Sequence, residues 1–277
     1  MLVVVAHADD LTLFIGGTVA CWVELGWRVV VVRATDDRRD SVGLGEADTV
    51  RRNRAELEAA AAILGVNELV ELGWPTDTLA EVSEVAIRAQ VIEQVRRHRP
   101  YSLITFDRLS CPDEDNQDHL VVAAATDEAF WTAQFDLHHP EQVAAGLAPH
   151  GVFERCWFGR DVVGATHGVD ISGVLDRKVE AARAHPTMLT NFLNQLLLQA
   201  RTGGWRIPPL EEALAAGDPG RVIDPMLRLH AAAVGRRWGL DAAEELRVSR
   251  FGGLEPLLES WGERIGPGSA SGGGGEP

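Results

Sequence analysis

Residues 7–10 place metal-binding and acid–base side chains directly after a short apolar run at residues 2–6. His7 and Asp10 are three positions apart, so one turn of chain can direct both at a common point. Imidazole nitrogen and carboxylate oxygen together suit Zn²⁺ or a similar divalent cation. Asp9 then lies beside the metal without having to ligate it.

A second such segment, DEDNQDH at residues 113–119, follows the apolar run at 102–106 and opens a helical pattern. His119 can supply a third ligand, and Asp118 can orient a neighbouring group from outside the ligand set. Taken alone, an Asp–His pair at a helix start is usually a cap beside a surface histidine. Its joint placement with the first segment favours a metal site.

Three protein ligands leave one position of a tetrahedral zinc ion open, which is typical of a catalytic site. Zinc lowers the pKa of a bound water from 15.7 to about 7. Asp9 can accept the proton as that water attacks a carbonyl, while the metal holds the developing oxyanion. The predicted reaction is hydrolysis of an amide or ester.

Other interpretations of these segments stay open at this point. The Asp pair can cap the following helix, or bind Mg²⁺ as in a receiver domain, but receiver domains use a lysine late in the sheet. The sequence contains a single lysine, Lys178, which lies in a helical pattern. A nucleotide-binding module is disfavoured because Gly16 to Thr18 match GxGxxG poorly and no GK[ST] follows.

Apolar runs alternate with helical patterns over the first 130 residues. The predicted strands are 2–6, 28–34, 68–72 and 102–106, and the predicted helices are 14–25, 47–64, 81–98 and 119–131. This alternation predicts a Rossmann-like, doubly wound α/β fold with a mostly parallel sheet. Strands one and four should be neighbours, so that the two chemical segments face each other across one crevice.

The second half of the chain has a less regular pattern. We expect strands at 152–158 and 168–171, helices at 174–184, 189–201 and 225–238, and a strand or helix end at 245–250. The predicted organisation is a single domain over 1–265, with a core at 1–135 and a C-terminal helical and strand extension at 136–265. The glycine-rich tail at 266–277 should be disordered.

The composition restricts partners and location. The chain has 26 Lys+Arg against 41 Asp+Glu and a formal net charge of −15, which disfavours binding to nucleic acid or anionic membranes. Three cysteines without a CxxC motif suit a reducing cytoplasm. The N-terminal apolar run is too short for a signal peptide or a spanning helix. A homo-oligomer stays open.

The run VVVAHADDLTLFIGGTVA and the later NQDH resemble the PIG-L/LmbE-like zinc-dependent N-deacetylases. Their signature is AHPDD, a few residues, GG, and then HxDH or NxDH after the fourth strand. Softer matches at 56–66, 169–185 and 236–253 extend the resemblance over about residues 1–255. It implies that His7, Asp10 and His119 ligate the metal and that Asp9 is the general base.

Members of this family remove an acyl group, often acetyl, from the amino group of a sugar or sugar conjugate, so an N-acylated amino sugar is the expected substrate. Ala8 replaces the usual proline, and Leu11 replaces a frequent glutamate. Asn116, which we count with Asp118 among the catalytic candidates, stands where many members have a histidine. An amide can donate to an oxyanion but cannot deliver a proton. The alternative is therefore a catalytically altered or inactive metal-binding member.

Two further residues are weaker substrate-binding candidates. Asp36 follows the second strand at the same edge of the sheet and could bind a substrate hydroxyl, or simply lie in solvent. His185 ends a predicted helix and matches a histidine of the family pattern. It is expected to line the substrate cleft or to cap that helix.

Overall fold

The described part of the chain, residues 1–114 and 116–264 of a computed structural model, contains a sheet with the strand order β3-β2-β1-β4-β5-β7-β6. The tail expected at 266–277 lies outside the described residues. The strands are β1 (Leu2–Val5), β2 (Val30–Thr35), β3 (Glu68–Trp74), β4 (Ser102–Phe106), β5 (Glu154–Phe158), β6 (His167–Asp170) and β7 (Ala243–Arg250).

The doubly wound, mostly parallel sheet predicted from the sequence is confirmed. Strands β1 to β5 pair in parallel, and β7 runs antiparallel to both β5 and β6. The expected neighbours β1 and β4 pair with Leu2 beside Leu103. Their carboxyl ends therefore meet at one edge. The segment at 245–250, which the sequence left open between a strand and a helix end, belongs to strand β7, and β7 lies between β5 and the edge strand β6.

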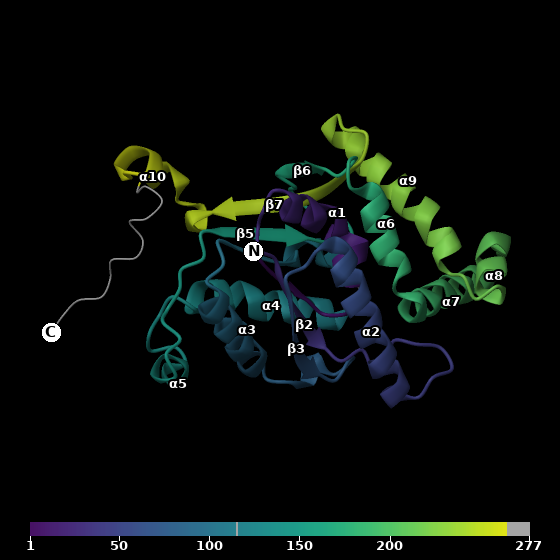
Figure 1. The fold of residues 1–277 in the computed structure, drawn as a ribbon, viewed down its shortest axis with the longest axis horizontal. Helices are drawn as coiled ribbons and strands as arrows, with labels where there is room; N and C mark the ends of the chain where they lie inside the picture. Colours follow the sequence, from purple (N-terminus) through teal and green to yellow (C-terminus); the bar gives the residue numbers. More distant parts are fainter. Residues whose placement is uncertain (115, 265–277) are drawn as a thin grey trace.

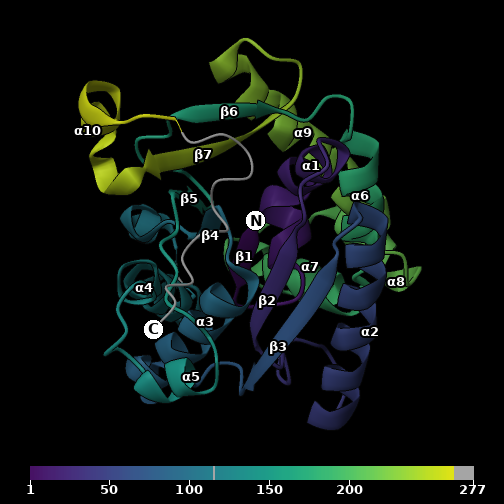
Figure 2. The same cartoon turned by 60° about the vertical axis from the view of Figure 1, so that its left-hand side comes forward.

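The helices form a layer on each face of this sheet. They are α1 (Asp10–Glu24), α2 (Glu46–Leu64), α3 (Glu84–His98), α4 (Gln117–Thr132), α5 (Pro140–Ala144), α6 (Leu175–Arg183), α7 (Pro186–Thr202), α8 (Pro208–Ala215), α9 (Gly220–Trp238) and α10 (Glu255–Trp261). Helices α3, α4 and α5 cover one face, and α1, α2 and α6 cover the other (Figures 1 and 2). Helices α7 and α8 lie beyond the end toward which β5 points (Figure 1).

Five of these helices differ clearly from the sequence prediction. One is α9, which begins at Gly220 rather than at residue 225. Helix α1 begins at Asp10 rather than at residue 14, because the residues after β1 turn directly into the helix. The short helices α5, α8 and α10 were not predicted. Each has proline in its first turn, where a fixed φ and a missing N–H are tolerated, but each is too short for a clear hydrophobic period.

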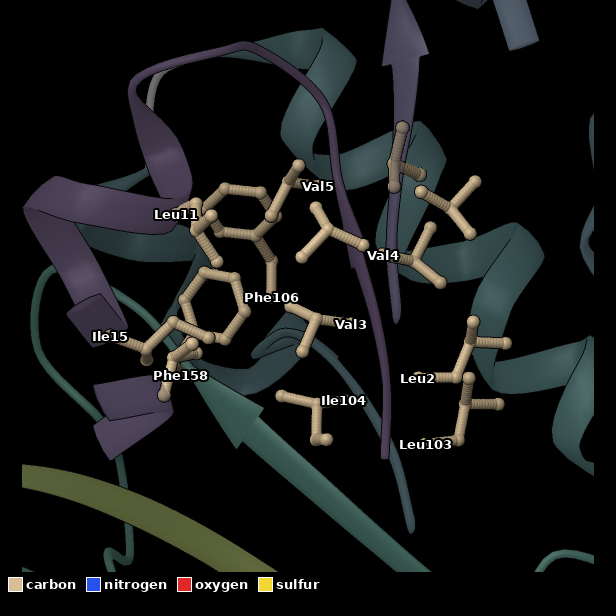
Figure 3. Packing of buried hydrophobic residues seen from close by; sticks show 14 of the residues in the cluster. Leu2, Val3, Val4, Val5, Leu11, Ile15, Leu103, Ile104, Phe106 and Phe158 are labelled. Atoms are coloured by element: carbon tan, nitrogen blue, oxygen red, sulfur yellow. The ribbon is translucent and has the colours of Figure 1, made fainter. Parts of the chain in front are cut away.

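Strand β1 is buried on both faces. Its residues alternate, so Val3 and Val5 lie on the side of α1, whereas Leu2 and Val4 lie on the opposite side (Figure 3). On the side of α1 the core contains Leu11, Ile15, Ile104, Phe106 and Phe158 (Figure 3). This burial fixes the register of β1 and therefore the place where its last residues leave the sheet.

A second apolar cluster joins helices α6 to α9. It contains Val179, Leu189, Leu193, Leu197, Leu210, Val222, Ile223 and Leu227. These helices pack on the core through contacts of α6 with α1 and α2. Among the described residues, no helix is both long and apolar enough to span a membrane.

The glycine pair of α1 allows α6 to approach closely. A Cβ on Gly17 would lie 2.7 Å from Cγ2 of Ile171, closer than side chains pack, and one on Gly16 would lie 3.3 Å from Cγ of Lys178. The GG dipeptide of the sequence motif is thus required for packing. It brings Lys178 against the main chain of α1.

Helix α1 is interrupted at Ile15, whose φ of −130° and ψ of 18° are not helical. The carbonyl of Leu13 accepts instead from Nζ of Lys178 at 3.0 Å. The amides of Gly17 and Thr18 donate to the Glu244 carboxylate at 3.0 and 2.7 Å. Lys178 and Glu244 also form a buried ion pair at 2.5 Å. Lys178, the only lysine of the sequence, and its partner Glu244 therefore bond to backbone groups of α1 at the point where the helix is interrupted.

We expect Lys178→Met to lower the free energy of unfolding by about 3–5 kcal/mol, because it leaves the Glu244 carboxylate buried without its counter-ion. The double variant Lys178→Met/Glu244→Gln removes that charge and should be clearly more stable than the single variant. Urea denaturation measures both. Arg177→Met is the control, since its ion pair with Glu24 is more exposed and should contribute about 1 kcal/mol or less. A double variant no more stable than Lys178→Met would contradict this account.

Candidate metal centre and its pocket

The carboxylate of Asp10 is held in place by the chain that precedes it. Its Oδ2 accepts hydrogen bonds from the backbone amides of Ala6 at 3.1 Å and His7 at 2.7 Å. Its Oδ1 lies 3.2 Å from Nε2 of His119. One oxygen thus fixes the turn between β1 and α1, and the other faces His119 in the first turn of α4.

The structure brings the three predicted ligands His7, Asp10 and His119 together, and all three are buried. Nδ1 of His7 lies 3.1 Å from Nε2 of His119 and 3.7 Å from Oδ2 of Asp10. A tetrahedral ion with bonds of about 2.0 Å separates its ligand atoms by about 3.3 Å. The donor atoms and their spacing therefore fit a divalent metal such as zinc. We call these residues the ligand triad.

Each histidine of the triad has a carboxylate at its other ring nitrogen. Oδ2 of Asp118 lies 3.4 Å from Nε2 of His7, and it accepts from the backbone amide of Asp77 at 2.6 Å. Oε2 of Glu114 lies 2.9 Å from Nδ1 of His119. Carboxylates in these positions orient a ligating histidine and raise its basicity. Asp118 was expected in this role, whereas Glu114 was not singled out in the acidic run.

The imidazoles bind protons strongly in the metal-free arrangement. Burial alone would lower the pKa of His7, but Asp118 and the charge of Asp10 together raise it to about 10. Burial alone would also lower the pKa of His119, but Asp10 and Glu114 raise it to about 9. A metal must therefore displace protons to bind.

Asp9 lies at the N-terminus of α1, where its side chain makes no capping hydrogen bond. Its carboxylate lines the pocket beside the ligand triad. Burial and the nearby charge of Asp10 raise the pKa of Asp9 to about 8, and a bound cation would lower it again. This arrangement argues against the capping alternative for Asp9 and keeps its carboxylate available for proton transfer.

The loop after β2 supports the turn that carries His7. Asp37 is buried and accepts from the backbone amide of Ala8 at 3.2 Å, from Nη1 of Arg33 at 2.6 Å and from Oγ1 of Thr35 at 2.8 Å. Asn53 of α2 donates to the backbone oxygen of Asp37 at 3.3 Å. The turn after β1 is thus tied to the strand beside it.

The same loop brings Asp40 into the pocket. Nδ2 of Asn53 donates to its backbone oxygen at 3.3 Å. Oδ2 of Asp40 is buried and has no hydrogen-bond partner among the described residues. Burial raises the pKa of this carboxyl to about 7. An unpaired acceptor in this position suits a substrate hydroxyl.

The pocket over the triad has a volume of about 130 Å³. The loops after β1, β2, β4 and β5 and one face of α7 form its walls: His7, Asp9, Asp10, Leu13, Phe14, Asp40, Asn116, His119, Arg160, Met188, Asn191, Phe192 and Gln195. Glu56 of α2 fixes the start of α7 by accepting from the amide and hydroxyl of Thr187 at 3.0 and 2.6 Å. The first half of the chain thus supplies the ligand triad, and α7 from the C-terminal half forms a wall of the pocket over it.

Asn116 has two functions in this wall. Its Oδ1 accepts from the backbone amide of Asp118 at 2.9 Å and so caps α4. Because the oxygen is used in this way, the Nδ2 amide is the group that remains to donate to a ligand in the pocket. The substitution of a frequent family histidine therefore leaves a hydrogen-bond donor but no acid.

The two weaker substrate candidates lie outside the lining of this pocket. The carboxylate of Asp36 pairs with Arg38, at 2.5 Å from its Nη2, and Asp40 is the acid of this loop that lines the pocket. His185 is fully buried just before α7, and neither of its ring nitrogens has a hydrogen-bond partner in the described part of the chain. Burial lowers the pKa of His185 to about 3. It therefore stays neutral. His185 occupies the N-cap position of α7, but its side chain makes no capping hydrogen bond.

Other lining residues were missed for identifiable reasons. Arg160 comes two residues after the end of β5. The rule that polar residues following a parallel strand lie at the carboxyl edge of the sheet, which selected His7 and His119, therefore applied to Arg160 as well. Asn191 and Gln195 are four positions apart on α7 and share one face. Nothing in the sequence indicates that this face lies over the carboxyl edge of the sheet.

Comparison with known proteins places this site in a family. The family model described as "PIG-L: GlcNAc-PI de-N-acetylase" matches residues 2–130. The 1D-myo-inositol 2-acetamido-2-deoxy-alpha-D-glucopyranoside deacetylase of Mycolicibacterium smegmatis is 30% identical over 238 residues, which cover 69% of this chain and 80% of that protein. The diacetylchitobiose deacetylase of Thermococcus kodakarensis is 28% identical over 188 residues, covering 67% of this chain and 68% of that protein.

The solved structure of N,N'-diacetylchitobiose deacetylase from Pyrococcus horikoshii has the same fold. Its TM-score is 0.72 at 21% sequence identity, and the match covers 97% of this chain and 87% of that chain. The resemblance inferred from the AHADD and NQDH segments is thereby confirmed by independent comparisons of sequence and structure. The chain belongs to the PIG-L (GlcNAc-PI de-N-acetylase) family.

Proposed function

We propose that this protein is a zinc-dependent N-deacetylase that removes an acyl group, acetyl in the simplest case, from the amino group of an amino sugar or sugar conjugate. The observation that carries the proposal is the buried ligand triad at metal-binding separations, with the uncommitted carboxylate of Asp9 beside it. The relatives named above, a 1D-myo-inositol 2-acetamido-2-deoxy-alpha-D-glucopyranoside deacetylase and a diacetylchitobiose deacetylase, support this substrate class.

His7, Asp10 and His119 would hold the zinc ion, which supplies a polarising charge for the amide carbonyl and makes water more acidic. Asp9 takes a proton from the attacking water as the new C–O bond forms. Asp9 then returns that proton to the nitrogen as the C–N bond breaks, giving a carboxylate and an amine. Asn116 donates a hydrogen bond to the developing oxyanion, and Asp118 keeps His7 in its ligating orientation.

The polar residues of the pocket suggest how a sugar is bound. We assign hydroxyl recognition to Asp40, Asn191 and Gln195, which line the pocket together. Asp36 is retained only as a residue that shapes this loop, because its carboxylate is paired with Arg38. His185 is a neutral buried group outside the lining of the pocket.

The wider organisation is part of the same proposal. We take residues 1–265 as one deacetylase domain, with a core at 1–135 completed by the extension at 136–265. The net charge of −15 favours a small-molecule substrate over nucleic acid, and the cysteine pattern favours the cytoplasm.

Asp9→Ala should retain bound zinc but lose about 10²–10⁴-fold in kcat, because the general base is removed. His7→Ala and His119→Ala should lose both metal and activity. Metal content by elemental analysis and amine release from a panel of N-acetylglucosaminyl compounds measure these effects, with the exposed Asp136→Ala as a control. An Asp9→Ala rate near that of wild type would refute the base assignment. Metal binding without amine release from any compound would favour the catalytically altered alternative.

Zinc binding to the metal-free protein should strengthen as the pH rises from 7 toward 9. The raised pKa values of His7 and His119, about 10 and about 9, mean that both imidazoles hold protons at neutral pH. Zinc must displace these protons, so its affinity should rise by about tenfold to hundredfold per pH unit. Chelator competition at several pH values measures the slope. If the zinc affinity did not change between pH 7 and pH 9, the imidazoles would already be deprotonated at neutral pH.

Glu114→Gln should weaken zinc binding by about 10–100-fold, because the amide no longer supplies a negative charge at Nδ1 of His119. At saturating zinc, most of the wild-type kcat should return, which separates an effect on metal affinity from a direct role in the reaction. Chelator competition and zinc titration of activity give the two numbers. Glu141→Gln, an exposed change, is the matched control. A kcat that stays low at saturating zinc would place Glu114 in the chemistry instead.

A further inference from the structure

An apolar groove adjoins the metal pocket. Its apolar lining consists of Leu13 and Phe14 of α1, Phe192 of α7, and Ile223, Met226 and Leu227 of α9, and we call these residues the acyl groove. Gly159, Arg160 and His230 complete the lining. Its volume is about 310 Å³. Leu13, Phe14, Arg160 and Phe192 line both the groove and the metal pocket, so the two spaces adjoin.

The groove opens from one particular side of the metal pocket. Strands β2 and β5 lie on opposite sides of the β1–β4 pair. Asp40 follows β2, whereas Arg160 follows β5 and lines both the pocket and the groove. Asp40, the acidic residue assigned to hydroxyl recognition, and the entrance to the acyl groove therefore lie on opposite sides of the ligand triad.

This arrangement matches the two ends of a secondary amide. Such an amide is planar and strongly prefers the trans form, so its two substituents leave the carbonyl–nitrogen bond in opposite directions. An amide beside Asp9 with its sugar toward Asp40 has its acyl substituent directed toward β5. There the wall contains Phe14, Phe192 and the apolar face of α9, together with Gly159, Arg160 and His230.

We propose that the acyl groove binds the acyl chain of the substrate and that the enzyme prefers N-acyl amino sugars with chains longer than acetyl. The inference rests on the proposed function and deepens it. On α9, Ile223, Met226 and Leu227 are spaced by three and one residues and form one stripe, so a chain of several methylenes can lie along it. An acetyl group would leave this apolar surface uncovered.

A chain-length series tests the proposal. N-acetyl-, N-butanoyl-, N-hexanoyl- and N-octanoyl-glucosamine are compared by glucosamine release with the zinc-loaded protein. Each fully buried methylene should raise kcat/KM by about fourfold, so hexanoyl should exceed acetyl by up to about 200-fold. Calorimetric binding of the same compounds to the metal-free protein should strengthen in the same order, which provides a readout that does not depend on turnover.

A substitution at the far end of the groove tests the location. Met226 lines the groove but not the metal pocket, and it is 39% exposed, so Met226→Trp is compatible with folding. The tryptophan should reduce the hexanoyl-to-acetyl ratio of kcat/KM by roughly tenfold or more, since about two methylenes lose their contacts. Leu229→Trp is the control. Leu229 is on the same helix, 70% exposed and outside the groove, and this change should leave the ratio as in wild type.

Three results would overturn the proposal. One is a wild-type enzyme that is fastest on acetyl and slows with every added methylene. Another is a gain that follows the alkyl aglycone in N-acetylglucosaminides from methyl to hexyl, which would assign the groove to the other end of the substrate. The third is a chain-length gain that Met226→Trp leaves unchanged.

The design separates this inference from the function on which it rests. Hydrolysis of the acetyl compound without any chain-length preference would sustain the deacetylase proposal and reject the acyl groove. Failure of the zinc-loaded protein to cleave any amide would reject the deacetylase proposal. Binding to the metal-free protein would still report on the groove, because flat affinities across the series would reject it independently.

Discussion

The need to compensate buried negative charge governs the carboxyl edge of the sheet. The pocket and its surroundings contain the carboxylates of Asp9, Asp10, Asp37, Asp40, Glu114 and Asp118. The buried Arg33 pairs with Asp37, and the two imidazoles of the ligand triad take up protons in the metal-free protein. Buried charge is costly unless it is paired. The family chemistry and the physical demand of the site therefore agree, since both call for a cation between His7 and His119.

The surrounding structure keeps these groups fixed rather than merely near one another. The carboxylates of Asp10 and Asp37 each accept a hydrogen bond from a backbone amide in the turn after β1. Glu56 accepts a hydrogen bond from Thr187 at the start of α7, and this helix forms one wall of the pocket. Groups held by such hydrogen bonds need little reorganisation when a substrate enters, which is the main requirement for electrostatic catalysis. Asp40 and the acyl groove lie on opposite sides of the triad, which is the basis of the substrate orientation proposed above.

The sequence was sufficient for the parts of this protein that depend on local pattern. The alternation of apolar runs and helices predicted the order of β1 to β4, and the position of His7, Asp10 and His119 after strand ends predicted their meeting. What could not be predicted depends on long-range packing. Short helices such as α8 have no clear period, Asp40 rather than Asp36 reaches the pocket because α2 holds its loop, and the face of α7 over the site is set by a contact with Glu56.

The interruption of α1 has a consequence for the order in which parts of the protein can reach their final structure during synthesis. The segment that carries Asp10, Leu13 and Phe14 lacks two of its own backbone hydrogen bonds, and the groups that replace them lie 165 and 226 positions further along the chain. A ribosome delivers all three triad residues long before it delivers Glu244. A nascent chain that stops short of that residue has every metal ligand but leaves the amides of Gly17 and Thr18 without their acceptor. The segment that carries Asp10 therefore cannot complete its hydrogen bonds until Glu244 has been synthesised.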